Sequence, residues 1–250
     1  CSSDLVLGFT NVDDVGQEGI ELALQDILAG MSGSRRVIQE NYKRIIEDVA
    51  ALRPARPGQD VQLALDSRVQ NLAYRALKQA VIEQKAKGGG IVVIDAHTGE
   101  VLALANLPAY NPNNRAHFSP QQVRNRAVTD AFEPGSTLKP FTVALALEQG
   151  KISPDTVIQT APGSMTIGPA TIRDAHPQGA LTVAQVIQKS SNIGTAKIAL
   201  NYLAPQEMWT LFEHVGFGQA PKLGFPGETA GRSEEHTSEL QSLAYLVCRL

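Results

Sequence analysis

The sequence has few of the residues that cross-link a fold or bind metals. Its 250 residues include two cysteines, Cys1 and Cys248, which stand near opposite ends of the chain and lack the spacing of metal ligands. No disulfide can be argued between them, and so low a count fits a cytosolic protein and a large exported bacterial domain equally well. The five histidines are scattered, with no pair at metal-ligand spacing, so a metal site is not expected.

Long hydrophobic runs and long charged runs are also absent. No apolar stretch approaches the ~20 residues of a membrane span. The net charge is −3, without an acidic or basic run, so nothing in the charge pattern suggests nucleic acid or a strongly charged substrate as a partner. The chain starts at Cys1 and reads like the middle of a protein, so the lack of a signal or anchor says little about location.

The composition is that of an ordinary globular protein. With 43% hydrophobic and 19% charged residues, the chain can form one sizeable domain, or one domain and a smaller one. Residues 1–58 carry no regular pattern and end in a linker marked by Pro54, Pro57 and Gly58. The elements expected here are a short strand before a loop at 8–14, a helix over 17–29, and two short strands, near 37–38 and 45–46, that can pair.

A helix and a hairpin are predicted after this linker. Asp66 or Ser67 caps the helix, and apolar residues recur along it at helical spacing. Two apolar runs, 91–95 and 101–105, flank Gly99 and predict a strand, a turn and a second strand. The first strand is apolar throughout, and we expect it to be central.

A serine and a lysine stand three positions apart at the start of a later predicted helix. A short helix over 121–131 leads to this stretch, and the later helix, which begins at Ser136 and Lys139, ends near Gly150. Positions i and i+3 share a helix face, so the spacing places the Ser136 hydroxyl beside the Lys139 amine. Pro140 is not tolerated deep inside a helix, which places Ser136 in or next to the first turn.

This pair can act as a nucleophile and its base. A serine hydroxyl becomes a good nucleophile when a base takes its proton. A lysine can be that base where burial or nearby cations lower its pKa. The N-terminal end of the helix dipole also favours negative charge at the reacting centre. An ordinary helix start with a solvated lysine gives the same pattern, so the pair alone decides nothing.

Turn residues dominate the stretch from Gly150 to Gly179, and helices follow. Thr182 caps a first helix, and two more are expected over 193–203 and 205–216. Strands in the first part and helices in the second predict an α/β domain, of the α+β kind, with a helical insert.

A polar turn, Ser190-Ser191-Asn192, separates two of these helices. A hydroxyl and an amide can meet there at the edge of a cleft, where the hydroxyl can relay a proton and the amide can hold a substrate amide. A turn that merely breaks a helix gives the same pattern. However, Ser-x-x-Lys and Ser-x-Asn each occur once in the sequence, and their order is that of the penicillin-recognising acyl-serine enzymes.

The residues around both motifs resemble class B penicillin-binding proteins, the monofunctional peptidoglycan D,D-transpeptidases. Near the start, residues 8–13 and 19–21 resemble the division-specific members more than the elongation-specific ones. The resemblance runs from about residue 5 to Gly231, and it implies a serine transpeptidase-like domain preceded by a pedestal or dimerisation-type segment. The stretches that carry it are 132–140, 189–194, 95–103, 110–114 and 224–228.

The resemblance implies a role for each motif residue. Ser136 is the acylated nucleophile, with its backbone N–H as one oxyanion donor, and Lys139 is the general base. Ser190 relays a proton to the leaving amine, and Asn192 contacts the donor peptide. The implied partners are peptidoglycan stem peptides, β-lactams and membrane proteins of the division machinery, and no cofactor is implied. The implied location is the periplasmic face of the bacterial inner membrane, with an anchor upstream of this sequence.

The third motif of the family, Lys-Thr/Ser-Gly on a strand after Ser-x-Asn, is missing. The only similar triplet is His97-Thr98-Gly99, which precedes Ser136 and lies at the predicted hairpin turn. We therefore interpret it as a turn. Because this motif is missing, the chain as written is expected to be inactive.

Family-like sequence stops at Gly231. Residues 232–242 resemble the in-frame translation of a common sequencing-library adapter, which makes 232–250 a non-native tail; an amphipathic tail helix is the alternative. The expected division of the chain is the end of a pedestal domain at 1–58, the first portion of a transpeptidase domain at 59–231, and this tail.

Two other functions remain open. A serine β-lactamase shares Ser-x-x-Lys but must release its acyl group to water, and the N-terminal segment argues against it. A β-lactam sensor or a scaffold in the division machinery would keep the fold without catalysis.

Overall fold

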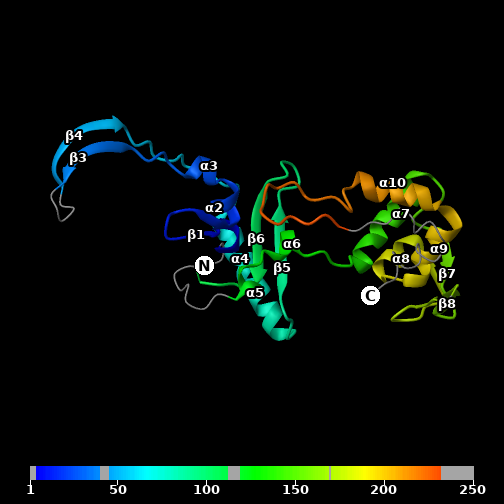
Figure 1. Ribbon diagram of the computed structural model, residues 1–250. Coiled ribbons are helices and arrows are strands. Elements are labelled where there is room, and N and C mark those ends of the chain that lie inside the picture. The colour runs from blue at the N-terminus through cyan, green and yellow to red at the C-terminus, as the bar shows by residue number, and fades with distance from the viewer. Residues whose placement is uncertain (1–3, 40–44, 112–118, 169, 232–250) are drawn as a thin grey trace. The chain divides into compact units, whose positions relative to one another are not determined.

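The computed structural model describes residues 4–39, 45–111, 119–168 and 170–231. The chain divides into two compact units (Figure 1). The first unit is Cys1–Asp130 with Lys222–Glu228, and the second is Ala131–Pro221 with Thr229–Leu250. The predicted tail at 232–250 lies outside the described residues.

The first unit contains six helices, all short except α4, and three antiparallel strand pairs in the described residues. Its pairs are β1 with β2, β3 with β4, and β5 with β6. In chain order its elements are α1 (Asp4–Leu7), β1 (Phe9–Thr10), β2 (Gly16–Glu18), α2 (Gly19–Ala23), α3 (Gln25–Leu28), β3 (Ser34–Gln39), β4 (Ile45–Arg53), α4 (Ser67–Glu83), β5 (Gly89–Ile94), β6 (Val101–Leu107), α5 (Pro120–Val123) and α6 (Arg126–Thr129).

Three predicted segments before the candidate site differ from the helices and strands that the structure shows. The strand expected before the loop at 8–14 is the helix α1, and part of that loop pairs as β1 with β2. The helix expected over 17–29 is two helices, because Leu24 leaves helical geometry at φ −114° and ψ 23°. The helix expected over 121–131 is also broken, into α5 and α6, where Arg124 takes an extended conformation.

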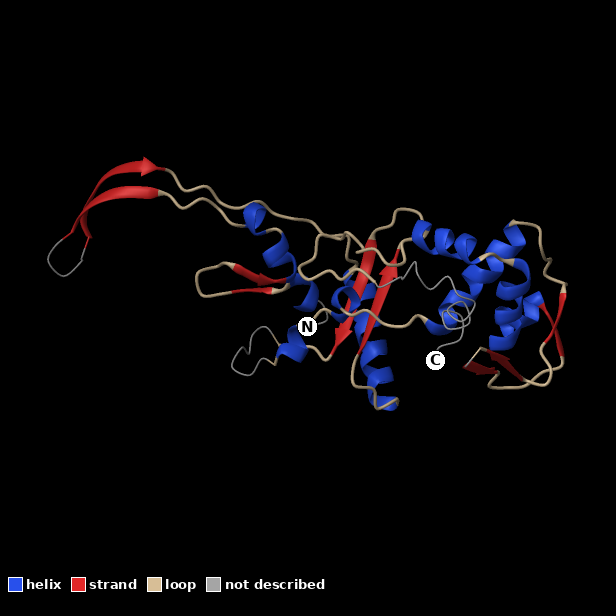
Figure 2. Ribbon diagram, turned by 45° about the vertical axis from the view of Figure 1, so that its right-hand side comes forward, coloured by secondary structure: helices blue, strands red, loops and turns tan. Residues whose placement is uncertain are grey.

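The two predicted strands near residues 37 and 45 do pair. β3 and β4 form an antiparallel ribbon with Ile38 opposite Glu47, and Figure 2 shows the two strands curving together. Three register shifts along the ribbon mark irregular pairing, which increases the local twist.

The helix α4 starts where the sequence predicted. The Asp66 carboxylate accepts hydrogen bonds from the backbone N–H of Arg68 at 2.8 Å and of Val69 at 3.2 Å. The Arg68 side chain, together with these two N–H groups, holds the pKa of Asp66 at about 2. The helix then packs Ala73 and Leu77 against β6.

The hairpin of β5 and β6 turns at Gly99, as predicted. Gly99 has φ 78°, and the Asp95 carboxylate accepts the N–H groups of His97 and Thr98. The triplet His97-Thr98-Gly99 is therefore a turn.

The expectation that β5 is the central strand is wrong within the described residues: Val92 and Ile94 of β5 are exposed, whereas Ala103 and Ala105 of β6 are buried. A strand that is apolar throughout predicts burial on both faces, but the residues of β5 alternate between half-buried and exposed positions.

The second unit combines four helices, a 3₁₀ turn and two strand pairs in the described residues. Figure 2 shows the strands of this unit at the edge of its helices. In chain order its elements are a 3₁₀ turn (Gly135–Leu138), α7 (Lys139–Glu148), β7 (Val157–Gln159), β8 (Ser164–Ile167), β9 (Ala170–Arg173), β10 (Ala180–Thr182), α8 (Val183–Gln188), α9 (Asn192–Tyr202) and α10 (Pro205–His214).

A single large apolar core joins the four helices of the second unit. α7, α8, α9 and α10 each contribute side chains that are almost fully buried. Burial of this kind is the main favourable term in folding, and it fixes the helices that carry both motifs. The most buried members are Ala146, Val183, Val186, Ile198, Ala199 and Met208.

The turn-rich stretch between Gly150 and Gly179 contains strands that the sequence did not predict. β7 pairs with β10, with Ile158 opposite Leu181, and β8 pairs with β9. Each strand is only three or four residues long, which is too short for an alternating pattern to stand out among glycines and prolines.

The predicted cap at Thr182 is confirmed: its side chain accepts the N–H of Gln185 in a capping box.

Within the described residues, no helix combines the length and the apolar character that a membrane crossing needs.

Gln70 is the buried polar link between α4 and β6, and its loss should destabilise the first unit. Its side-chain amide donates to the Leu104 carbonyl at 2.9 Å and accepts from the Leu104 N–H at 2.8 Å. Gln70→Leu would leave both backbone groups unpaired, so we expect a loss of about 1–3 kcal/mol in the free energy of unfolding, measured in urea. Gln79→Leu, at an exposed position of the same helix, should change it by less than about 0.5 kcal/mol. Equal effects of the two changes would contradict this role.

Candidate active site

Ser136 lies in the first turn of its helix, as the sequence predicted. The 3₁₀ turn begins at Gly135, whose φ of 56° lets the chain enter it, and α7 follows directly from Lys139. Pro140 occupies an N-terminal position of α7, where its missing N–H has no helical partner to lose. This local geometry presents the Ser136 side chain at the N-terminal end of the helix.

The Lys139 side chain is buried and reaches the polar turn between α8 and α9. Only 2% of the residue is exposed. Its Nζ donates to the backbone carbonyl of Ser190 at 2.7 Å, to Ser190 Oγ at 3.0 Å and to Asn192 Oδ1 at 2.5 Å. An ammonium has three donors, and hydrogen bonds to a charged group are stronger than those between neutral ones. Lys139 therefore ties the start of α7 to a turn about fifty residues further along the chain.

Ser190 also reaches the other serine. Its Oγ donates to Ser136 Oγ at 3.2 Å, so the Ser190 hydroxyl lies between Ser136 and Lys139. The structure thus brings together all four residues that the sequence singled out: Ser136, Lys139, Ser190 and Asn192. The sequence predicted that the Ser136 hydroxyl lies beside the Lys139 amine, and the hydrogen bonds that link the two run through Ser190.

The turn that carries Ser190 has an uncommon backbone. Ser190 has φ 52°, in the left-handed region that residues with a Cβ seldom adopt. The N–H of Ser190 donates to Ile187 and that of Ser191 to Val186, which closes the end of α8. This sharp reversal lets α9 start at Asn192, two residues later, and turns the Ser190 carbonyl and hydroxyl to the same lysine.

Close packing of α8 and α9 depends on a glycine. A Cβ added to Gly194 would lie 2.6 Å from Val186 Cγ2, which is closer than such atoms approach. Gly194 follows the Ser-x-Asn motif, so the small residue lets the two helices meet directly beside it.

Two groups at the site were not anticipated from the sequence. The Arg173 carbonyl accepts from Asn192 Nδ2 at 2.8 Å, and the Asp174 carboxylate accepts from Ser191, Asn192 and Ile193. One is a backbone atom and the other is a single acidic residue among turn residues, so neither leaves a pattern that sequence reasoning can detect.

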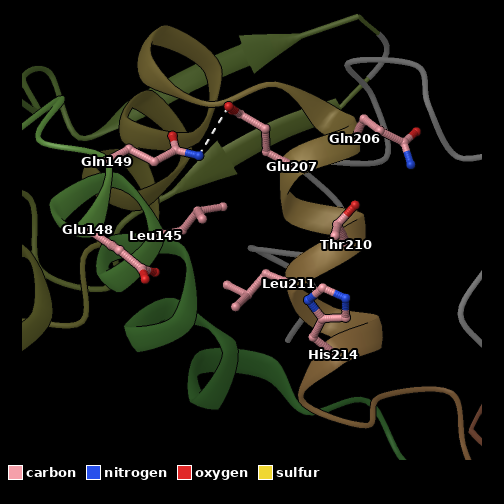
Figure 3. Close-up of a pocket in the computed structure, with 8 residues that line it drawn as sticks. All are labelled: Leu145, Glu148, Gln149, Gln206, Glu207, Thr210, Leu211 and His214. Carbon is pink, nitrogen blue, oxygen red and sulfur yellow. Dashed lines mark hydrogen bonds between the residues drawn. The ribbon is translucent and has the colours of Figure 1, made fainter.

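A cleft of about 370 Å³ opens between α7 and α10 and is separate from these residues (Figure 3). Leu145 and Leu211 face it from the two helices. Gln149 donates to Glu207 at 3.1 Å across one end, and Lys151 pairs with the same carboxylate. None of the four motif residues lines this cleft. Its lining residues are Leu145, Glu148, Gln149, Gln206, Glu207, Thr210, Leu211 and His214.

Metal chemistry has no candidate site in the part of the chain that the structure describes. No group of three or more histidine, cysteine, aspartate or glutamate side chains is placed there to hold an ion. The chemistry that the described site offers is that of hydroxyls, an amine and an amide.

Two protein-family models match the chain. The model for the penicillin-binding protein transpeptidase domain matches residues 89–245, and the model for the penicillin-binding protein dimerisation domain matches residues 2–63. The four motif residues lie inside the first match.

Relatives in several bacteria have similar sequences. A probable peptidoglycan D,D-transpeptidase PenA of Neisseria flavescens is 47% identical over 223 residues, which is 88% of this chain and 55% of the relative. The peptidoglycan D,D-transpeptidase FtsI of Escherichia coli K12 is 41% identical over 226 residues, which is 90% of this chain and 38% of the relative. The chain therefore spans about half the length, or less, of the curated relatives it matches.

Solved structures show the same fold. A peptidoglycan glycosyltransferase from Burkholderia ambifaria superimposes with a TM-score of 0.65 at 47% identity, over 73% of this chain and 54% of that structure. The transpeptidase domain of penicillin-binding protein 3 from Burkholderia pseudomallei gives 0.65 at 44% identity, over 75% of this chain and 52% of that structure.

Replacing the buried lysine should destabilise the second unit. Lys139→Met would leave the Ser190 carbonyl and Asn192 Oδ1 without their charged donor, so we expect a loss of about 1–3 kcal/mol in the free energy of unfolding. Lys151→Met removes a lysine from an exposed ion pair in the same unit and should cost about 0.5 kcal/mol or less. Urea unfolding of both variants measures these losses. A Lys139→Met protein as stable as the unmutated one would show that the hydrogen bonds of Lys139 do not stabilise the second unit.

Proposed function

Because this chain belongs to the penicillin-binding protein transpeptidase family, we propose that it is part of a peptidoglycan D,D-transpeptidase and carries that enzyme's nucleophile. The observation that carries the proposal is the line of hydrogen bonds from Ser136 through Ser190 to Lys139. These groups supply a hydroxyl, a relay and a base within hydrogen-bond reach of one another, as acyl transfer requires.

The reaction takes two steps. Ser136 Oγ attacks the carbonyl carbon between the last two D-alanines of a stem peptide, forms an ester and releases the terminal D-alanine. For this attack Lys139 must be the neutral amine, so the ammonium of the resting site first gives up a proton to solvent. The proton of the Ser136 hydroxyl then passes to Lys139 and, by way of Ser190, to the departing amine. An amine of a neighbouring strand then attacks the ester: a new amide C–N bond forms, the ester C–O bond breaks, and a proton of the attacking amine passes to Ser136 Oγ. Covalent catalysis of this kind divides one difficult transfer into two easier ones.

The surroundings of Ser136 suit the charge that develops in these steps. Its place in the 3₁₀ turn that leads into α7 puts the helix N-terminus at the reacting carbonyl, where developing negative charge is favoured. We assign the Ser136 backbone N–H as one oxyanion donor. We also assign Asn192, whose amide bonds to Lys139 and to the Arg173 carbonyl, to contact the donor peptide.

The wider role follows from the relatives. We propose that the protein takes peptidoglycan stem peptides and β-lactams at this site, and that it serves septal cell-wall synthesis with membrane proteins of the division machinery. Its place would be the periplasmic face of the inner membrane, with an anchor upstream of this sequence. The support is that FtsI and PenA are named peptidoglycan D,D-transpeptidases.

The division of the chain is a proposal as well. We assign residues 1–58 to the end of a pedestal domain, 59–231 to the first portion of a transpeptidase domain, and 232–250 to a non-native tail. The transpeptidase model matches as far as residue 245, so the last boundary rests on the adapter-like residues alone. Genomic DNA beyond the codon for Gly231 tests this boundary. The reading frame should continue into a Lys-Thr/Ser-Gly motif, and genomic codons for Arg232-Ser233-Glu234 at this place would overturn the assignment. The natural product of that frame is called the completed protein below.

Loss of the Ser136 hydroxyl should abolish acylation. In the completed protein, Ser136→Ala should not become covalently labelled by a fluorescent penicillin and should not support septation in a complementation assay. Thr137→Ala, which removes the hydroxyl of the next residue, should still be labelled. Full septation by Ser136→Ala would leave only a scaffold role, and rapid hydrolysis of penicillin by the unmutated protein would indicate a β-lactamase.

The 250-residue chain as written should be a poor enzyme even though both motifs are assembled. It has no Lys-Thr/Ser-Gly triplet to supply the second oxyanion donor. Removal of one such donor lowers a rate by roughly 10²–10³-fold, and we expect at least this deficit in penicillin labelling relative to the completed protein. Equal labelling rates would show that the third motif is dispensable here.

A further inference from the structure

We propose that Asp174 is a positioning residue: its carboxylate, just beyond β9, holds the turn that presents Ser190 and Asn192 to Lys139. This inference rests on the proposed function, because the position of these groups matters to a rate only if Ser136 is acylated. Asp174 is 8% exposed and follows a surface hairpin, and no motif of the sequence points to it.

The contacts of Asp174 converge on one turn. One carboxylate oxygen accepts from Ser191 Oγ at 2.7 Å. The other accepts from the backbone N–H of Asn192 at 2.6 Å and of Ile193 at 3.0 Å. A carboxylate that receives several hydrogen bonds forms strong, charge-assisted contacts. Three consecutive residues, Ser191, Asn192 and Ile193, are therefore hydrogen-bonded to one carboxylate.

This turn needs such support from outside. Ser190 is held at φ 52°, in the left-handed region that is unfavourable for a residue with a Cβ. Strained conformations of this kind persist when surrounding contacts determine them. Lys139 holds the turn from the α7 side through the Ser190 carbonyl, and Asp174 holds the N–H groups of Asn192 and Ile193 from the β9 side.

Asp174 also fits the electrostatics of the helix that follows. The N–H groups of Asn192 and Ile193 are among the first of α9, which has no partners of its own for them. A carboxylate there satisfies them and matches the positive end of the helix dipole. Ser191 caps the same helix by accepting the N–H of Gly194, and its hydroxyl donates to Asp174. The cap and the carboxylate form one connected unit.

The neighbouring residue holds the motif side chain itself. The Arg173 carbonyl accepts from Asn192 Nδ2 at 2.8 Å, while Asn192 Oδ1 accepts from Lys139. The Asn192 amide therefore forms one hydrogen bond to the end of β9 and one to the first residue of α7. Two adjacent residues at the end of one strand fix both the main chain and the side chain of the Ser-x-Asn motif, and a displaced Asp174 would move both.

The test is the rate of acylation of the completed protein by benzylpenicillin, separated into binding and chemistry. A displacement of about 1 Å at a reacting group can cost 10²-fold. We expect Asp174→Ala to lower the first-order acylation rate at saturating penicillin by about 10–100-fold, with a smaller change in the concentration that gives half the maximal rate. Asp174→Asn keeps an oxygen for the two backbone N–H groups and can donate to Ser191 Oγ, so it should restore most of the rate.

A matched control separates positioning from stability. Thr182→Ala removes the cap of α8, the helix before the motif, and should lower the urea midpoint of unfolding without slowing acylation. An unchanged rate in Asp174→Ala, or an equal slowing in Thr182→Ala, would overturn the inference. If Asp174→Ala does not fold, Ser191→Ala decides: a rate reduced threefold or more supports the inference, and an unchanged rate overturns it.

The two proposals fail in different ways. If the unmutated completed protein is not acylated at Ser136, the proposed function fails and the inference fails with it. If it is acylated and the Asp174 variants keep its rate, only the inference fails.

Discussion

The site depends on one buried cation. Placing an ammonium away from water is costly unless acceptors surround it, and Lys139 finds them in the Ser190 carbonyl, the Ser190 hydroxyl and the Asn192 amide. This requirement links the first residue of α7 to the turn between α8 and α9. The two motifs meet because the lysine needs the oxygens of that turn, and the Ser136 hydroxyl then lies against Ser190.

The rest of the second unit keeps this contact in place. The apolar core of α7 to α10 fixes the helix that carries Lys139, and Gly194 lets α8 and α9 approach closely enough to form the turn. From the other side, the end of β9 holds the same turn through Asp174 and the Arg173 carbonyl. Three kinds of interaction thus position Ser190 and Asn192: apolar burial, close helix packing, and hydrogen bonds to Lys139 and Asp174. Acyl transfer requires this positioning, because a nucleophile and its base work only within hydrogen-bond reach.

Local signals in the sequence predicted part of this arrangement. The caps at Asp66 and Thr182, the turn at Gly99 and the placing of Ser136 in a first turn are confirmed, because each depends on a residue and its immediate neighbours. The meeting of Ser136 with the Ser-x-Asn turn was inferred from the resemblance to a family, and the structure brings these residues together. The catalytic roles of these residues stay predictions.

Features that depend on distant contacts were missed or misjudged. β7 pairs with β10 across an intervening hairpin, and the burial of β5 depends on the helices beside it. β8 and β9 were missed because each is only four residues long. The contacts of Arg173 and Asp174 had no sequence signal, since a backbone carbonyl is common to every residue and one aspartate in a turn-rich stretch is ordinary. Tertiary contacts decide such features.

The energetic coupling between Lys139 and Asn192 tests the central claim most directly. It is obtained from the unfolding free energies of the unmutated chain, Lys139→Met, Asn192→Ala and the double variant. A hydrogen bond between a buried ammonium and an amide oxygen predicts a coupling of about 1.5–3 kcal/mol. Additive effects, with a coupling near zero, would show that the lysine does not hold the Ser-x-Asn turn and would contradict this account of the site.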